Sequence, residues 1–122
     1  MNGPHKGKAG PARLWGALHH SLDGLSAAFR HKEAFRLEVV LALVLIPVAV
    51  HTPASGAGKA MMVASVLLVL VVELINTGIE AVTDRISLEN HVLAKRAKDM
   101  GSAAVMLAAI DVPVVWLLVL LG

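Results

Sequence analysis

The sequence has 122 residues, of which 57% are hydrophobic and only 16% are charged, and its mean hydropathy is +0.72. A water-soluble domain of this size could not bury so much apolar surface, so the composition predicts an integral membrane protein with one domain. The absence of cysteine excludes a disulfide framework and a thiolate metal site, and the net charge of +2 alone indicates no partner.

The chain opens with a stretch rich in Gly, Pro and basic residues, MNGPHKGKAGPA, which predicts a flexible N-terminus over 1–12. Apolar side chains then recur every three or four residues over 13–34, as they do on one face of a helix. This spacing predicts an amphipathic helix that lies on the membrane surface, packs on protein, or does both.

Three apolar segments follow the surface helix, and a helix needs about 20 residues to cross the hydrocarbon core of a membrane. We expect membrane spans at about 35–51, 59–84 and 100–121, with a turn-rich loop after the first span and a polar connection over 86–99. The sequence therefore predicts that 13–122 form a single all-α membrane domain, made of one surface helix and three transmembrane helices.

The basic residues predict the orientation of these spans in the membrane. Six of the 11 Lys and Arg residues lie at or before the start of the first span, and four lie between the second and third spans. The remaining one, Lys59, lies beside the first loop. Because basic residues favour the cytoplasmic side, we expect a cytoplasmic N-terminus and a C-terminus on the outer side.

The second span contains a row of polar residues within VELINTGIEAVTDR, residues 72–85. Glu73, Asn76, Glu80 and Asp84 fall within an arc of about 100° on a helical wheel, in the cytoplasmic half of the span. Such a stripe must face protein or a water-filled cleft. The acids would repel one another unless a proton or a cation such as Mg²⁺ intervened, and burial also suits a carboxylate to act as a general base.

The connection that follows the stripe places cations beside carboxylates, with Glu89, His91, Arg96, Lys98 and Asp99. Lysine and arginine are common ligands of phosphate, so this mixture indicates a metal-bound polyphosphate. The motifs GxxxxGK[ST] and GxGxxG are absent, which excludes a P-loop or a protein-kinase plan. The pattern favours a carboxylate site at the cytoplasmic face over a purely structural ion-pair network, and it leaves the substrate unidentified.

Three stretches of the chain together carry a resemblance to a known family. VELINTGIEAVTDRI (72–86), RAKDMGSAAV (96–105) and AAFRHKEAFRLE (27–38) resemble the prokaryotic diacylglycerol kinases, over about 13–121. The resemblance implies a homotrimer with shared active sites in the bacterial inner membrane. It implies transfer of the γ-phosphate of MgATP to the hydroxyl of diacylglycerol, with Mg²⁺ as cofactor, membrane lipid as a partner and no nucleic acid.

The resemblance also implies roles for individual residues. Glu73 matches the general base of the family, and Glu80 matches a metal ligand that is also close to ATP. The ATP-binding positions that it implies are Arg13, Asn76, Glu80, His91, Lys98 and Asp99. The positions that it implies for substrate binding or support of the site are Asp84, Arg85 and Ser102.

One position departs from the family pattern, which has a second metal-binding Glu three residues before the Phe of AFR. That position is Lys32 in this chain, and the acid follows at Glu33. A step of one residue rotates a side chain by about 100° on a helix. Either Glu33 still reaches the metal, or Lys32 faces the phosphates and Glu80 holds the metal together with water and ATP oxygens.

Two other functions are compatible with parts of the pattern. The first is an undecaprenol kinase of the same superfamily, although the junction over 27–38 and the region of His91 look more like the diacylglycerol branch. A small ion-coupled transporter could use Glu73 and Glu80 as a proton relay, but it would leave the charged connection without a role. We expect Asp111, the one acid of the third span, to be neutral and hydrogen-bonded near Pro113 rather than catalytic.

Overall fold

The computed structural model describes residues 10–86 and 91–122, which form four α-helices and no strand. The predicted all-helical class is confirmed. The helices are α1 (Gly10–His31), α2 (Glu33–Val50), α3 (Gly56–Thr83) and α4 (His91–Leu121).

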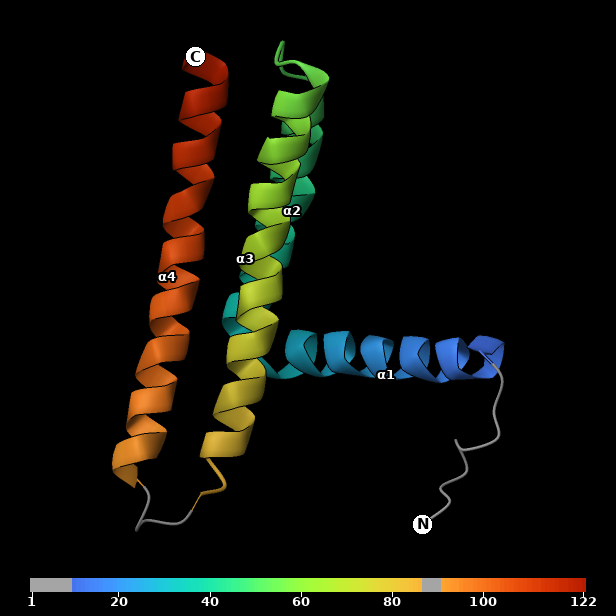
Figure 1. Ribbon diagram of the computed structural model, residues 1–122, viewed down its shortest axis with the longest axis vertical. Helices are drawn as coiled ribbons and strands as arrows, with labels where there is room; N and C mark the ends of the chain where they lie inside the picture. The colour runs from blue at the N-terminus through green and yellow to red at the C-terminus, as the bar shows by residue number, and fades with distance from the viewer. Residues whose placement is uncertain (1–9, 87–90) are drawn as a thin grey trace.

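The three later helices run side by side, and α1 extends sideways away from them near one end (Figure 1). α3 packs against both α2 and α4, and α1 contacts α2 and α3. The end of the bundle near α1 also holds the last turn of α3 and the first turn of α4. The chain therefore brings its most charged segments to one end of an otherwise apolar bundle.

The corner between α1 and α2 is a single extended residue, Lys32, with φ −121° and ψ 105°. The Arg36 guanidinium donates hydrogen bonds from Nη1 to the carbonyl oxygens of Phe29 (2.9 Å) and Arg30 (3.1 Å). Carbonyl groups at the end of a helix lack intrahelical partners, so Arg36 satisfies two of them. This capping fixes the corner and holds Lys32 at its apex.

α1 is longer at its start than the sequence pattern predicts. It begins at Gly10, so 10–12, which we expected to be flexible, are helical. Pro11 explains the difference, because proline suits the first turn of a helix, where its missing N–H has no partner to lose. The rest of the predicted flexible N-terminus, 1–9, lies outside the described residues.

α4 also extends further than predicted, because most of the connection over 86–99 is helical from His91 onward. The segment contains no Gly or Pro, and Lys95 pairs with Asp99 one turn later at 2.7 Å, which supports a helix. α3 begins at Gly56, a few residues before the predicted 59, where the Ser55 hydroxyl accepts a hydrogen bond from the Gly58 amide at 3.0 Å.

The contact between α3 and α4 depends on small residues at one end and on a tryptophan further along. Gly101 is buried directly against Asn76, and a Cβ atom at this position would collide with the Asn76 side chain. Further along, the Trp116 indole donates from Nε1 toward the Met62 carbonyl and the Ser65 hydroxyl, both at 3.2 Å. These two contacts fix the register of α4 along α3.

Most large apolar side chains lie on the outside of the bundle, including Leu43 and Leu118, each 70% exposed. Among the described residues, α3 and α4 are long and apolar enough to cross a membrane. α2 has 18 residues and three charged groups near its start, which makes it shorter and more polar than the other two. An apolar outer surface of this extent requires lipid or other protein around it.

Gly101→Ala tests the close approach of α3 and α4. The added methyl group overpacks a buried contact, which typically costs about 1–3 kcal/mol, so we expect a lower free energy of unfolding in detergent. Gly16→Ala is the control, because no heavy atom surrounds that position within 4 Å and alanine favours a helix. Equal stability of Gly101→Ala and the parent protein would contradict the packing described above.

Candidate active site

The polar stripe of α3 passes from a buried to an exposed environment along the helix. Glu73 and Asn76 are only 2% and 4% exposed, whereas the side chains of Glu80 and Asp84 are 26% and 62% exposed. The predicted placement of the stripe against protein is therefore confirmed for its first two members. Its last two members reach water at the end of the bundle where α4 begins.

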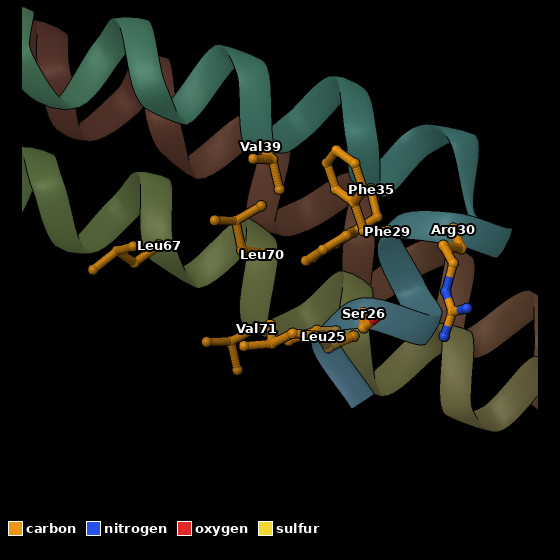
Figure 2. A pocket seen from close by; sticks show the side chains of 10 residues that line it. Leu25, Ser26, Phe29, Arg30, Phe35, Val39, Leu67, Leu70 and Val71 are labelled. Atoms are coloured by element: carbon orange, nitrogen blue, oxygen red, sulfur yellow. The ribbon is translucent and has the colours of Figure 1, made fainter. Parts of the chain in front are cut away.

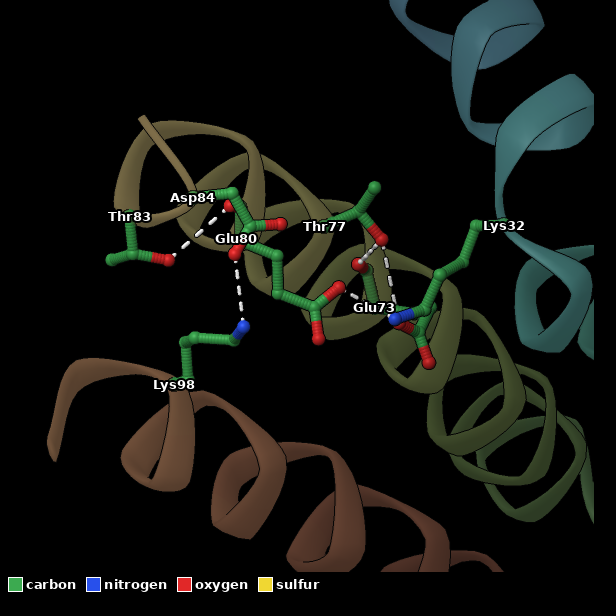
Figure 3. A network of polar contacts seen from close by, with 7 residues as sticks. All are labelled: Lys32, Glu73, Thr77, Glu80, Thr83, Asp84 and Lys98. Carbon is green, nitrogen blue, oxygen red and sulfur yellow. Dashed lines mark hydrogen bonds and ion pairs between the residues drawn. The ribbon is translucent and has the colours of Figure 1, made fainter. Parts of the chain in front are cut away.

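Lys32 reaches from the corner between α1 and α2 into this stripe (Figure 3). Its Nζ atom donates a hydrogen bond to Glu80 Oε1 at 2.6 Å and lies 3.8 Å from Glu73 Oε2. The bond to Glu80 is the main reason why the pKa of Lys32 is raised above its usual value of 10.5. The Lys32 ammonium therefore lies on Glu80 and beside Glu73, and the two metal arrangements that the sequence left open stay predictions.

A third carboxylate, Glu38, joins the same cluster from α2. Its carboxyl group interacts with that of Glu73 and with the Lys32 ammonium, and its Oε1 atom is buried without a hydrogen bond from the described residues. Sequence reasoning did not assign Glu38 to the site. Its position could have indicated a role in the site, because Glu38 is the only acid within the predicted span 35–51. Glu38, Glu73 and Glu80 are called the carboxylate cluster below.

Thr77 holds the Glu73 side chain in place from one turn further along α3. Its hydroxyl donates to the Glu73 carbonyl oxygen at 2.7 Å and lies 3.4 Å from Glu73 Oε2. Asn76 faces α4, and its Oδ1 atom is buried without a hydrogen bond from the described residues. The cluster thus contains one well-oriented carboxylate and a buried amide oxygen.

A second polar region lies where α3 ends and α4 begins. A hollow of about 290 Å³ brings together four residues predicted for the site, namely Asp84, His91, Lys98 and Asp99. Lys98 donates from Nζ to Asp84 Oδ1 at 2.9 Å, and both side chains are well exposed. Exposed ion pairs of this kind are weak, so the Lys98 ammonium can exchange its partner for another anion.

Four other residues predicted for the site lie apart from the carboxylate cluster: Arg13, Glu33, Arg85 and Ser102. All four are exposed, and no hydrogen bond or ion pair within the described residues joins any of them to the cluster. Arg13 is in the first turn of α1, at the end that points away from the three long helices (Figure 1). Their predicted roles remain predictions.

The carboxylate cluster does not provide a resident metal site. In the described part of the chain, no group of three or more His, Asp or Glu side chains is arranged to hold a metal ion. Glu80 has one oxygen bonded to Lys32 and keeps the other for an outside ligand. A single carboxylate oxygen suits a Mg²⁺ ion that arrives with phosphate oxygens and water as its other ligands.

Two apolar hollows lie between α1 and α3, beside the carboxylate cluster. The first has a volume of about 630 Å³ and is lined by side chains of α1, α2 and α3, including Phe29 and Phe35 (Figure 2). The second, of about 770 Å³, includes Thr77, the residue that holds Glu73. Leu25 and Leu74 line both hollows, so apolar space reaches the level of the buried Glu73.

Comparison with known proteins gives consistent similarities over nearly the whole chain. The family model described as prokaryotic diacylglycerol kinase matches residues 19–120. The diacylglycerol kinase of Pseudomonas aeruginosa is 50% identical over 119 residues, which cover 98% of this chain and 97% of that protein. The diacylglycerol kinases of Haemophilus influenzae and Escherichia coli K12 are 43% and 41% identical, over 88% and 91% of this chain and 91% of each relative.

Glu80→Gln tests the bond that Lys32 makes in the cluster. The raised pKa keeps the Lys32 amine protonated and slow to react with acetic anhydride near pH 9, and removal of the Glu80 charge lowers that pKa. We therefore expect several-fold faster acetylation of Lys32 in the variant, measured by mass spectrometry. Lys59 lies in the first turn of α3, at the opposite end of that helix from Glu80, and serves as the internal reference. An unchanged ratio of Lys32 to Lys59 labelling would contradict the contact.

Proposed function

Because this chain belongs to the prokaryotic diacylglycerol kinase family, we propose that the carboxylate cluster is where it transfers a phosphoryl group from ATP to diacylglycerol. The chain is a lipid kinase, as its relatives over nearly its full length are. Those relatives are named diacylglycerol kinases, which favours this substrate over undecaprenol and a kinase over a transporter. The observation that carries the assignment of the site is the buried Glu73, whose neighbour Thr77 lines an apolar hollow.

Glu73 is the general base in this proposal. A lipid hydroxyl has little acidity, so a carboxylate within hydrogen-bond reach must accept its proton as the oxygen attacks the γ-phosphorus. The bond from that phosphorus to the bridging oxygen of ATP then breaks, and the products are phosphatidic acid, ADP and a protonated Glu73. Thr77 lies beside this base, because its hydroxyl donates to the Glu73 backbone carbonyl and lies 3.4 Å from Glu73 Oε2.

The polyphosphate lies between the carboxylate cluster and the hollow at the start of α4. Lys98, His91 and Asp99 line that hollow, and Lys98 is the cation best placed to leave its partner for a phosphate. Asn76 belongs to the same polar stripe of α3 as Glu80, and its buried amide oxygen can accept a hydrogen bond. We assign these residues to the nucleotide, with Asp84 as the group that positions Lys98 in its absence.

Glu80 is the residue that we assign to the Mg²⁺ of the nucleotide. A Mg²⁺ ion held there would neutralise charge that develops on the phosphates during transfer. Glu33, the other predicted ligand, is exposed in the first turn of α2 and has no polar contact with Glu80. The geometry therefore supports the arrangement in which Lys32 faces the phosphates.

The lipid enters from the side of α1. Diacylglycerol has an apolar body and one hydroxyl, so it can place an acyl chain in the hollows that Leu25 and Leu74 share while the hydroxyl reaches Glu73. A site open to both lipid and water is useful because the two substrates arrive from different phases. The hollow of about 770 Å³ is the one that contacts the residue holding the base.

We also propose that the chain has three membrane spans and works as a homotrimer in the bacterial inner membrane. In this proposal α2 is the first of the three spans, and at 18 residues it needs the covered environment of a bundle for its charged first turns. The exposed apolar side chains of all three long helices suit lipid and neighbouring copies. A neighbouring copy could supply Arg13 to the shared site, and the basic residues place the N-terminus in the cytoplasm. Arg85 and Ser102 support the site from its aqueous edge.

Glu73→Gln tests the general base. Loss of the proton acceptor should lower the turnover number by about 10²–10⁴-fold while the variant keeps its helix content and oligomeric state. The measurement is transfer of labelled phosphate from ATP to diacylglycerol in proteoliposomes. Asp23→Asn, an acid on the exposed part of α1, is the control and should retain full turnover. Normal turnover in Glu73→Gln would remove the assignment.

Leu74→Trp tests the lipid hollows. A larger side chain at the wall that both hollows share should raise the KM for diacylglycerol several-fold and leave the KM for ATP unchanged. Leu43→Trp is the matched control, because Leu43 lies on the outside of α2 and lines neither hollow. If both variants changed the lipid KM equally, the hollows would have no special role in binding.

A further inference from the structure

The carboxylate cluster is an unusual environment because three acids meet close to the membrane, where isolated charge is costly. Glu73 is buried at 2% exposure, Glu80 is 26% exposed, and Glu38 has a buried oxygen without a hydrogen bond from the described residues. A proton or a positive charge among them relieves their mutual repulsion. Lys32 provides a positive charge, whereas Arg36, four residues later, is used to cap α1.

We propose that Lys32 is the resident cation of this cluster and takes the place of a protein-bound divalent metal ion. Its Nζ atom contacts Glu80 at 2.6 Å and Glu73 at 3.8 Å, so it lies between the two carboxylates that an ion would have to bridge. A divalent cation in the same space would lie close to the Lys32 ammonium, and the two positive charges would repel each other. The cluster therefore holds no divalent ion until the nucleotide brings one.

The backbone makes Lys32 suited to this role. It is the extended residue at the corner of α1 and α2, and the Arg36 cap fixes that corner. Its ammonium therefore reaches the cluster from a constrained position, with 24% of the side chain exposed. Lys32 is a positioning residue for Glu80 and Glu73, and it also presents a positive charge to the incoming phosphate.

This inference rests on the proposed function for its consequence in catalysis. If Lys32 neutralises the cluster, one metal ion per ATP is sufficient, and activity saturates when Mg²⁺ equals ATP. If Lys32 is replaced by an acid, four carboxylates with no resident cation require an ion of their own. The variant should then need free Mg²⁺ in excess of ATP.

The direct test is Mn²⁺ binding to the full-length protein in detergent micelles, without nucleotide or lipid, followed by the loss of the EPR signal of free Mn²⁺. The parent protein should leave the signal unchanged. Lys32→Glu should bind Mn²⁺ at least about tenfold more tightly than the parent protein. Lys32→Gln, which removes the cation without adding an acid, should show intermediate binding, and Lys32→Arg should show none.

Lys59→Glu is the matched control, because it makes the same change of charge in the first turn of α3, at the opposite end of that helix from the carboxylate cluster. It should bind Mn²⁺ as weakly as the parent protein does. Lys32→Gln and Lys32→Arg keep the test available if the acidic variant does not fold, which helix content and elution volume report.

Two results would overturn the proposal. One is Mn²⁺ binding by the parent protein as tight as that of Lys32→Glu, and the other is no difference between Lys32→Glu and Lys59→Glu. Neither result depends on phosphate transfer, so they are separate from a failure of the proposed function, which an inactive parent protein in proteoliposomes would reveal. A free-Mg²⁺ requirement in Lys32→Glu but not in Lys59→Glu would support the catalytic consequence.

Discussion

The ion pair between Lys32 and Glu80 joins two residues that are 48 positions apart and ties the corner of α1 and α2 to α3. Charges in a partly dry environment are stable only when they are paired and hydrogen-bonded, and loss of one partner leaves the other uncompensated. The buried Glu73 and the half-buried Glu38 interact with the same ammonium. The ion pair thus connects the corner, which the Arg36 cap fixes, to the level of Glu73 on α3.

The gradient of exposure along α3 separates two kinds of chemistry on one helix. Glu73 is buried beside apolar hollows, where a carboxylate is poorly hydrated and suited to accept a proton from a lipid hydroxyl. Asp84 and Lys98 lie in water where α3 ends and α4 begins, in the region that we propose for the highly charged nucleotide. Because the helix rises by about 1.5 Å per residue, the 11 steps from Glu73 to Asp84 cover roughly 16 Å, which is long enough to cross from lipid to water.

The sequence was informative wherever a feature depends on local periodicity. The helical class and the single polar arc of α3 follow from spacing, and the structure places Glu73 and Asn76 against protein as the arc requires. The contact of Lys32 with Glu80 depends instead on one extended residue and on a cap that Arg36 provides, and no periodic pattern encodes these. Glu38 was overlooked for the same reason, because its neighbours come from other helices.

α1 connects the depth of the site to the membrane surface. It is amphipathic and extends sideways from the bundle (Figure 1). An interfacial position for α1 would fix the height of the corner at Lys32 relative to the lipid headgroups. Since the Lys32 ammonium is bonded to Glu80, that height also sets the level of the carboxylate cluster on α3. In the proposed function, an interfacial α1 would therefore hold Glu73, the proposed base, at the boundary where a lipid hydroxyl and a polyphosphate meet.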